Sequence, residues 1–523
     1  MARRTGRGRV MSEAEPRSAS GAGSVAIVVA TPGDALALLA AERPGAVVDI
    51  VCAQPGTVDE HAALDRAVAD CGRLGVRVGG EPWILDAEVG KITARVLDVL
   101  RELRPLRVRT LDPDPARVSF DEQTKLPVIA EPPLRGSVAR ATIEAARTLQ
   151  RESGIPVFVL CHRAGVDPRL GAHACMRYPQ SARWLTKGSD GLLSAYLPSA
   201  AGVLRWTERP EADRWSGPEL LEVPGLLPGV TVVQDASGYV HLIGLRRVKR
   251  GDGHERVEVV HSTQYQTGRP LGPWHSAGNP NANDRHRARE VGFPSVAFDA
   301  QGNMHVFVRN FGHGVSTRKQ SPDGKWGAWQ HLRGIRVADE LAALPGRLGG
   351  VELWARTRDS AAAVRWHQEA PGGEWAEEAV LAVSPYPGSL SAAPEAGTVR
   401  YRYSGTNEVC VWVPGASPVS LGGADGEGPV GAAQGVGVQG WECTVVVRSG
   451  RDGACAVGAH ADGRPHGGVW WFDAGEASLV PPAVATDRRG RAIIAVMDVN
   501  GRLKVARQEP DANGLAFGAW SDA

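Results

Sequence analysis

The stretch Pro294–Leu332, PSVAFDAQGNMHVFVRNFGHGVSTRKQSPDGKWGAWQHL, decides the fold of most of this chain. Short runs rich in alternating and β-branched residues are separated by turns at Ala300–Asn303 and Asp323–Gly324. Four short strands joined by glycine-containing turns are typical of one blade of a β-propeller. The stretch therefore predicts a four-stranded antiparallel sheet.

Weaker copies of this unit lie on both sides of it. A repeat of this length that cannot bury its faces alone must stack against its neighbours, so the run predicts one propeller of seven blades. The predicted blades are Lys187–Val223, Val230–Trp274, Pro294–Leu332, Ala342–Leu381, Ser389–Leu421, Val430–Phe472 and Pro481–Trp520.

Tryptophan is concentrated in the same region. Of the 15 Trp residues, all except Trp83 lie between Trp184 and Trp520. A Trp that recurs at one phase of a repeat is expected to pack blade against blade, with stacking under a sugar ring as the alternative. Trp326, Trp366 and Trp470–Trp471 are less regular and fit either role. The regular positions, near the ends of the predicted units, are Trp215, Trp274, Trp329, Trp375 and Trp520.

Residues 24–180 follow a different pattern. Short apolar runs alternate with stretches whose apolar residues recur at helical spacing, which is typical of a parallel α/β sheet. We expect a multidomain chain with a Rossmann-like α/β domain over 24–180 and an all-β propeller over 181–523. The predicted strands are Ser24–Ala30, Val47–Ala53, Val108–Leu111 and Pro156–Cys161, and the predicted helices are Ala35–Ala41, Glu60–Gly75, Val89–Leu103 and Ser137–Arg151.

Composition excludes several classes of protein. Hydrophobic residues make up 43% and charged residues 22%, which are ordinary globular values and exclude wholesale disorder. The net charge of +1 gives no overall field for nucleic acid or an anionic membrane. Arg outnumbers Lys by 52 to 7, which is typical of a GC-rich bacterial genome.

The termini and the cysteines bear on location. Residues 1–23 are polar and charged without an apolar core, so we expect a disordered tail there. No apolar run is long enough to predict a transmembrane helix. Seven Cys without a CxxC pair fit reduced thiols better than a disulfide framework. We therefore expect a cytoplasmic protein.

The first region resembles the PIG-L/LmbE-like de-N-acetylases, zinc hydrolases that act on N-acetylglucosamine units. Residues 30–35 (ATPGDA) match the family's A-H-P-D-D-E motif after the first strand. Val99–Pro115, VLRELRPLRVRTLDPDP, is similar to the family's I-R-x-x-R-P-x-x-V-x-x-x-D-P segment, and Ser137–Ala146 stands where the family has H-x-x-H. The resemblance implies a Rossmann-like fold over about residues 24–165.

The residues that would carry the family's chemistry are mostly absent. Thr31 stands at the position of a metal-binding His, Gly33 at that of the base, and Ser137 opens a helix without His. Only Asp34 is kept, and one carboxylate cannot replace three protein ligands on a catalytic zinc. The degenerate positions predict a domain with the fold but without the activity.

Other side chains at strand ends remain candidates for binding. The carboxyl ends of parallel strands share one edge of a sheet, where ligands bind in such folds. Asp34 is read as a helix cap or a retained ligand, and Asp112 and Asp114 as turn residues or ligands of sugar hydroxyls. His162 is read as structural or ligand-binding. An alternative zinc set consists of Asp34, Cys161, His162 and His173.

The second region resembles PLL-type seven-bladed lectin propellers, which implies pockets for fucose and related sugars between blades. Trp326 and Trp329 are candidates for stacking on a sugar. The polar stretch Gly278–Gly292 is a solvated loop or an arch that supplies Arg285 to a ligand.

These features together predict a non-catalytic protein that binds a glycan or glycoconjugate. One alternative is a zinc-dependent deacetylase or amidohydrolase with a rebuilt metal site, and a second is a scaffold that binds a protein through one propeller face. We expect no cofactor, and zinc only under the first alternative. We expect neither nucleic acid nor a membrane span.

Overall fold

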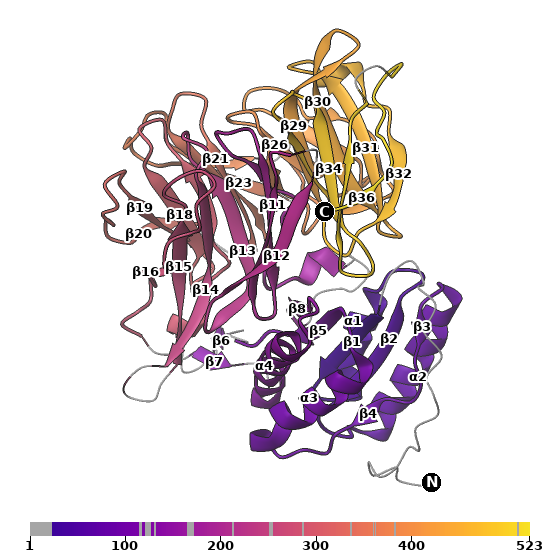
Figure 1. Cartoon of the computed structure of the whole chain (residues 1–523). Helices are drawn as coiled ribbons and strands as arrows, with labels where there is room; N and C mark the ends of the chain where they lie inside the picture. Colours follow the sequence, from indigo (N-terminus) through magenta and orange to yellow (C-terminus); the bar gives the residue numbers. More distant parts are fainter. Residues whose placement is uncertain are drawn as a thin grey trace.

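A computed structural model describes the chain from Ser24 to Ala523, apart from short gaps. The α/β domain comes first and lies against one side of a β-propeller (Figure 1). The predicted tail, residues 1–23, lies outside the described residues. The gaps are residues 115–117, 121–126, 130–131, 165–171, 212–213, 250, 252–254, 285–286, 335–336, 359, 361, 381–382 and 510–511.

The α/β domain is built on a sheet with the order β3-β2-β1-β5-β8, in which β4 also pairs with β2. All of these pairs are parallel, as predicted, and the order is that of a doubly wound sheet. The strands are β1 (Ser24–Val29), β2 (Val47–Cys52), β3 (Arg77–Val78), β4 (Trp83–Ile84), β5 (Arg107–Leu111) and β8 (Phe158–His162), and a separate hairpin pairs β6 (Val118–Phe120) with β7 (Pro127–Ile129).

Two helices cover each face of this sheet. α1 and α2 pack on one face around Ile27 and Leu38, while α3 and α4 pack on the other around Val96 and Ile143. Thr57 caps α2 by accepting the N–H of Glu60 at 3.2 Å. The helices are α1 (Pro32–Ala40), α2 (Val58–Arg73), α3 (Ile92–Leu103) and α4 (Pro133–Ser153), and the short 3₁₀ helices are η1 (Val89–Lys91), η3 (Ala172–Cys175), η4 (Arg287–Arg289) and η5 (Pro465–Gly467).

The propeller consists of seven four-stranded antiparallel sheets in the described part of the chain, which confirms the seven predicted blades. The first strands of most neighbouring blades contact one another around the axis. In order, the blades are β9 (Leu185–Lys187), β10 (Leu193–Ser199), β11 (Gly202–Glu208), β12 (Trp215–Glu222); β13 (Leu226–Gln234), β14 (Val240–Lys249), β15 (Glu255–Thr263), β16 (His275–Gly278); β17 (Ser295–Phe298), β18 (Met304–Arg309), β19 (Val315–Gln320), β20 (Gln330–Arg333); β21 (Val337–Pro345), β22 (Val351–Thr357), β23 (Ala363–His367), β24 (Ala376–Val380); β25 (Ser391–Ala392), β26 (Val399–Arg402), β27 (Val409–Trp412), β28 (Val419–Ser420); β29 (Gly426–Val438), β30 (Trp441–Gly450), β31 (Ala454–Ala461), β32 (Phe472–Ala477); β33 (Ala483–Thr486), β34 (Ala492–Met497), β35 (Leu503–Arg507), β36 (Ser521–Asp522).

The ring closes by contact between the first and last blades, without exchange of a strand. Strand β33 of the last blade lies against β9 of the first. The indole N–H of Trp184 donates to the Pro481 carbonyl at 2.8 Å, and Lys187 Nζ donates to the Asp487 carbonyl at 3.0 Å. Each blade is therefore one continuous segment of sequence, which is why the repeat can be recognised from the sequence alone.

The recurrent Trp residues pack each blade on the preceding one, as the repeat phase predicted. The Trp375 ring meets Phe307 edge-to-face at 5.6 Å, and the indole N–H of Trp520 donates to the Ala474 carbonyl at 2.6 Å. Trp471 occupies the same position before β32 and donates to the Leu421 carbonyl at 2.7 Å. Trp366 is 1% exposed and belongs to the core.

The two domains share their apolar cores. Phe158 of β8 lies in one cluster with Trp184, Leu197 and Val480, so propeller residues pack on this edge strand of the sheet. No helix in the described part of the chain is both long enough and apolar enough to span a membrane. The residues that follow the carboxyl ends of β5 and β8 also contact the propeller, where Asp114 pairs with Arg247 and Arg163 pairs with Asp339.

Candidate functional site

An ion pair closes the predicted site at the carboxyl end of β1. Asp34 is the third residue of α1, behind the cap Thr31, and its Oδ1 lies 2.6 Å from Arg135 Nη2. Thr31 Oγ1 donates to Glu60 Oε1 at 2.8 Å, and a Cβ added at Gly33 would meet that oxygen at 2.6 Å. A guanidinium and a hydrogen-bonded glutamate thus occupy the space beside the degenerate motif, where zinc and its base would be needed.

Ser137 lies one turn into α4 and plays no part in this pair. Its hydroxyl donates to the Pro133 carbonyl at 3.1 Å and accepts from Arg140 Nη2 at 3.2 Å. A serine bonded to its own helix in this way is a local backbone contact. The structure therefore assigns Ser137 no chemistry.

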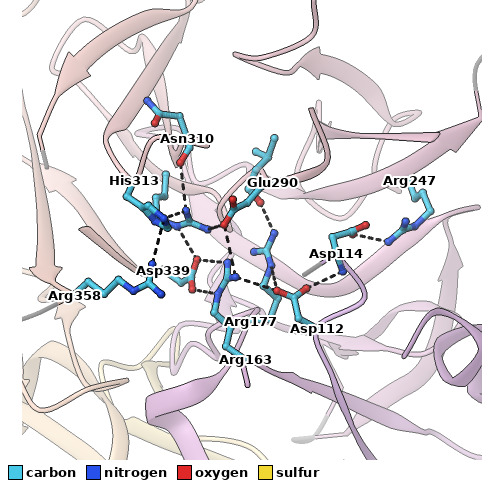
Figure 2. A network of polar contacts seen from close by, with 12 residues as sticks. Asp112, Asp114, Arg163, Arg177, Arg247, Glu290, Asn310, His313, Asp339 and Arg358 are labelled. Carbon is cyan, nitrogen blue, oxygen red and sulfur yellow. Dashed lines mark hydrogen bonds and ion pairs between the residues drawn. The ribbon is translucent and has the colours of Figure 1, made fainter. Parts of the chain in front are cut away.

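Asp112 and Asp114 follow β5 and are buried against the propeller, where both pair with arginines (Figure 2). Asp112 Oδ2 lies 3.0 Å from Arg163 Nη1 and 3.3 Å from Arg177 Nε. Asp114 Oδ2 lies 2.5 Å from Arg247 Nη2 on β14 of the propeller. Asp114 therefore binds the propeller directly and Asp112 binds two arginines of its own domain, so both carboxylates are already paired.

Arg163 continues this network into the propeller. Its Nη2 donates to Asp339 Oδ1 at 2.8 Å, while Arg309 donates to Asp339 at 2.9 Å and to Glu290 at 3.0 Å. Burial alone would raise the pKa of Asp339, but Arg163 and Arg309 hold it well below its usual range. With Arg177 and Asp112, the network holds three cations and three carboxylates.

His162, one of the two histidines of the alternative zinc set, is engaged by residues outside that set. His162 Nε2 accepts from Arg109 Nη1 at 3.0 Å, and its Nδ1 lies 3.1 Å from Cys175 Sγ. Burial and the Arg109 charge hold the pKa of His162 well below its usual range, and burial lowers that of His173 to about 4. No group of three His, Cys, Asp or Glu among the described residues could hold a metal ion, so Asp34, Cys161, His162 and His173 do not form the alternative site.

Trp326 and Trp329 lie in the wall between the second and third blades. The Trp326 ring meets His261 edge-to-face at 5.7 Å, and the guanidinium of Arg318 lies 5.4 Å from its centre. The Trp329 ring packs in the core cluster shared by these blades. Packing therefore accounts for both rings. Arg285 lies outside the described residues.

An open cleft with exposed aromatic side chains lies between the sixth and seventh blades. Trp441, at the start of β30, is 60% exposed, and Trp470, before β32, is 86% exposed. Both line a cavity of about 650 Å³, which we call the tryptophan cleft. Arg464 lies 6.0 Å from the centre of the Trp441 ring. Further polar groups at the cleft are Gln439, His460 and Asn513.

A second cleft, of about 570 Å³, lies between the second and third blades. His241, His261 and the 66% exposed Tyr265 line it, and we call it the histidine cleft. His261 Nε2 and His241 Nδ1 both bond the hydroxyl of Thr263, at 2.8 and 3.1 Å. Burial and the neighbouring His241 lower the pKa of His261 to about 4, so its imidazole is neutral at pH 7.

The two clefts occupy equivalent places in their repeats. Each has a histidine near the end of the third strand, His261 on β15 and His460 on β31. Each also has an exposed aromatic residue between the third and fourth strands, Tyr265 and Trp470. Aligning the units on their third strands would have found these residues, whereas the regular Trp phase pointed to the packing positions.

No protein-family model matches this sequence, and no curated protein matches it. The de-N-acetylase resemblance of the first domain therefore stays a prediction. Among solved structures, the chain is similar to SapL1 lectin in complex with alpha methyl fucoside, at 13% identity and a TM-score of 0.33 over 55% of this chain and 94% of that one. It is also similar to AofleA from Arthrobotrys oligospora, at 10% identity and a TM-score of 0.35 over 66% of this chain and 90% of that one. A PL25 ulvan lyase is similar at 11% identity and a TM-score of 0.40 over 66% of this chain and 97% of that one. Such identities and TM-scores assign neither a family nor a ligand to this chain.

Proposed function

We propose that this protein binds a glycan or glycoconjugate in the clefts between its blades, with the tryptophan cleft as the main site. The exposure of Trp441 and Trp470 beside one cavity carries the proposal. Large aromatic side chains are rarely left in water without a partner, and clustered exposure of this kind marks a binding surface.

The chemistry of the cleft fits a sugar. A pyranose has a face of C–H groups that packs on an aromatic ring and a rim of hydroxyls that needs hydrogen bonds. The indoles supply flat apolar area, and Arg464 supplies donors next to Trp441. Gln439 Nε2 donates to Asn513 Oδ1 at 2.5 Å, which joins the sixth and seventh blades at the rim and leaves polar atoms of both amides for hydroxyls.

We propose further that the α/β domain anchors the propeller and does not deacetylate the glycan. Asp34, Asp112 and Asp114, the carboxylates at the predicted catalytic edge, are each held in an ion pair with an arginine. Incubation of the purified protein with N-acetylglucosamine and its oligomers, with and without added zinc, should release no acetate. Acetate release that depends on the protein would overturn this part of the proposal.

Replacing Trp470 should weaken glycan binding. Trp470→Ala removes an exposed ring without disturbing the core, so we expect normal folding and an affinity about tenfold lower, which corresponds to about 1.4 kcal/mol. The measurement is a screen of fucosylated and N-acetylhexosamine glycans followed by titration calorimetry of the best ligand. The blue shift of Trp fluorescence on binding should also diminish.

Leu348→Ala is the matched control, because Leu348 is 73% exposed in the fourth blade and lines neither cleft. It should bind as the unaltered protein does. Equal affinity of Trp470→Ala and Leu348→Ala would exclude the tryptophan cleft, and silence across the whole glycan screen would contradict the function itself.

A further inference from the structure

The axis of the propeller holds a further, smaller cavity of about 90 Å³. Residues of β13, β17, β21, β25 and β29, which are the first strands of five blades, line its wall. The connecting segment Pro179–Arg183 runs along it on the way from the α/β domain to β9. We call it the axial cavity.

Arg183 is the cation of the axial cavity, and its guanidinium has no partner in the described part of the chain. Its backbone N–H donates to Ser181 Oγ at 3.0 Å, but no hydrogen bond or ion pair engages the side chain. The side chain is solvent-exposed where it lines the cavity, and partial desolvation by the surrounding blades lowers the pKa of the guanidinium. No carboxylate opposes this effect, in contrast to Arg163, whose pKa Asp339 and Asp112 raise against burial.

The acidic residues of the axial cavity are already satisfied. Asp339 binds Arg163 and Arg309, as described above. The carboxylate of Glu340 accepts the backbone N–H of Gly388 at 2.9 Å and that of Leu390. Neither carboxylate is therefore free to neutralise Arg183, which leaves the described lining of the cavity with one unpaired, solvent-exposed positive charge that attracts anions.

Neutral donors stand on the same wall. Ser181 Oγ accepts the N–H of Arg183, and Ser295 Oγ accepts the N–H of Ala343 at 2.9 Å, so both hydroxyl protons remain available. Gln180 adds an amide whose side chain makes no hydrogen bond among the described residues. A planar guanidinium with hydroxyl and amide groups in the same cavity lining supplies the donor types that bind an oxyanion.

We propose that the axial cavity binds a small oxyanion, a phosphoryl or carboxylate group, with Arg183 as its charged anchor. The cavity has room for a group of that size and shares no lining residue with the tryptophan cleft, so the two sites are separate. The anion joins the connecting segment to the blades and neutralises the unpaired charge of Arg183.

The proposed anion site is tested by titration calorimetry of the full chain, once with inorganic phosphate and once with sodium acetate. Sodium chloride keeps the ionic strength constant. We expect one equivalent of one of these anions to bind and to raise the melting temperature in a saturable way. The two arms distinguish a phosphoryl from a carboxylate ligand. Arg183→Met should weaken that binding at least tenfold, and without the anion its melting temperature should stay close to that of the unaltered protein, because Arg183 is exposed and makes no ion pair among the described residues.

Arg95→Met is the matched control, since Arg95 is exposed on α3, away from the propeller axis, and it should bind the anion normally. Arg183→Lys keeps the charge without the fork and should retain weakened binding. Absence of heat and of thermal stabilisation with both anions would overturn the proposal, as would equal binding by Arg183→Met. Neither result bears on glycan binding, because the two sites share no residue.

Discussion

The free energy of unfolding should fall steeply as the pH is lowered from about 6.5 to about 4, because several histidines are buried without charge. Burial is the first cause in each case. It lowers the pKa of His173, His261 and His313 to about 4 and holds that of His162 well below its usual range. The cationic form of an imidazole loses its hydration in such sites.

The direction of the effect follows from proton uptake. Between pH 6.5 and 4 these histidines take up protons in the unfolded chain but stay neutral in the folded one, so acid favours unfolding. Their stabilising contribution is complete above pH 6.5 and is lost progressively toward pH 4. For His173 and His261, which are 8% and 7% exposed, the difference corresponds to roughly 3 kcal/mol each. Two such groups alone approach the total stability of many domains.

Urea unfolding measured from pH 7.5 to 4.5 checks this expectation. His261→Gln should make the free energy of unfolding depend less on pH, because it removes one of the buried neutral histidines. His466→Gln replaces an exposed histidine of η5 and should leave the pH dependence unchanged. A free energy of unfolding that is the same at pH 7 and pH 4.5 would contradict the assignment of neutral buried histidines.

The blades were predictable because their signals are local. Alternating strands and glycine turns lie within about 40 residues of one another, and each blade is continuous in sequence. The parallel strands of the first domain were equally local, as buried β-branched runs such as Val47–Cys52. The pairing order, the small strands β3 and β4 and the hairpin of β6 and β7 needed the structure.

The ion pairs at the domain boundary left no local trace. Asp112 meets Arg163 of its own domain across 51 residues of sequence, Asp114 meets Arg247 of the propeller across 133, and no spacing rule links such partners. The high arginine content is typical of a GC-rich genome and carries no structural signal by itself. In the structure, arginines neutralise Asp34, Asp112 and Asp114, the carboxylates that the sequence offers as ligand-binding candidates. Sequence alone places a carboxylate at a strand end but does not show what covers it.

The neighbouring residues Trp470 and Trp471 show the same limit at the candidate site. Trp471 packs on the preceding blade, while Trp470 stands 86% exposed beside the cleft. Adjacent residues in extended chain point to opposite sides, so a difference of one residue in register separates a packing residue from a binding residue. The turn before β32 is irregular, so the sequence pattern does not show which of the two residues faces the preceding blade.

Replacement of Asp339 should be the most damaging single change at the domain boundary. Asp339→Asn leaves Arg163, Arg177 and Arg309 buried with only Asp112 and Glu290 to balance them. Removing one partner of a buried ionic network costs about 3–5 kcal/mol, since the remaining charges keep their desolvation cost. Asparagine has nearly the same shape as aspartate, so a lower free energy of unfolding in this variant reports the lost charge and not altered packing.

The measurement is the free energy of unfolding in urea, with Asp323→Asn as the control. Asp323 pairs with Lys325 on the surface at 2.8 Å, and exposed pairs of this kind contribute little, so this variant should unfold with the unaltered protein. An effect of Asp339→Asn as small as that of Asp323→Asn would show that the network does not hold the domains. A large effect at Asp339 alone would show that this ionic network holds the two domains together. Arg163 and Arg177, which pair with Asp112, also bind propeller residues.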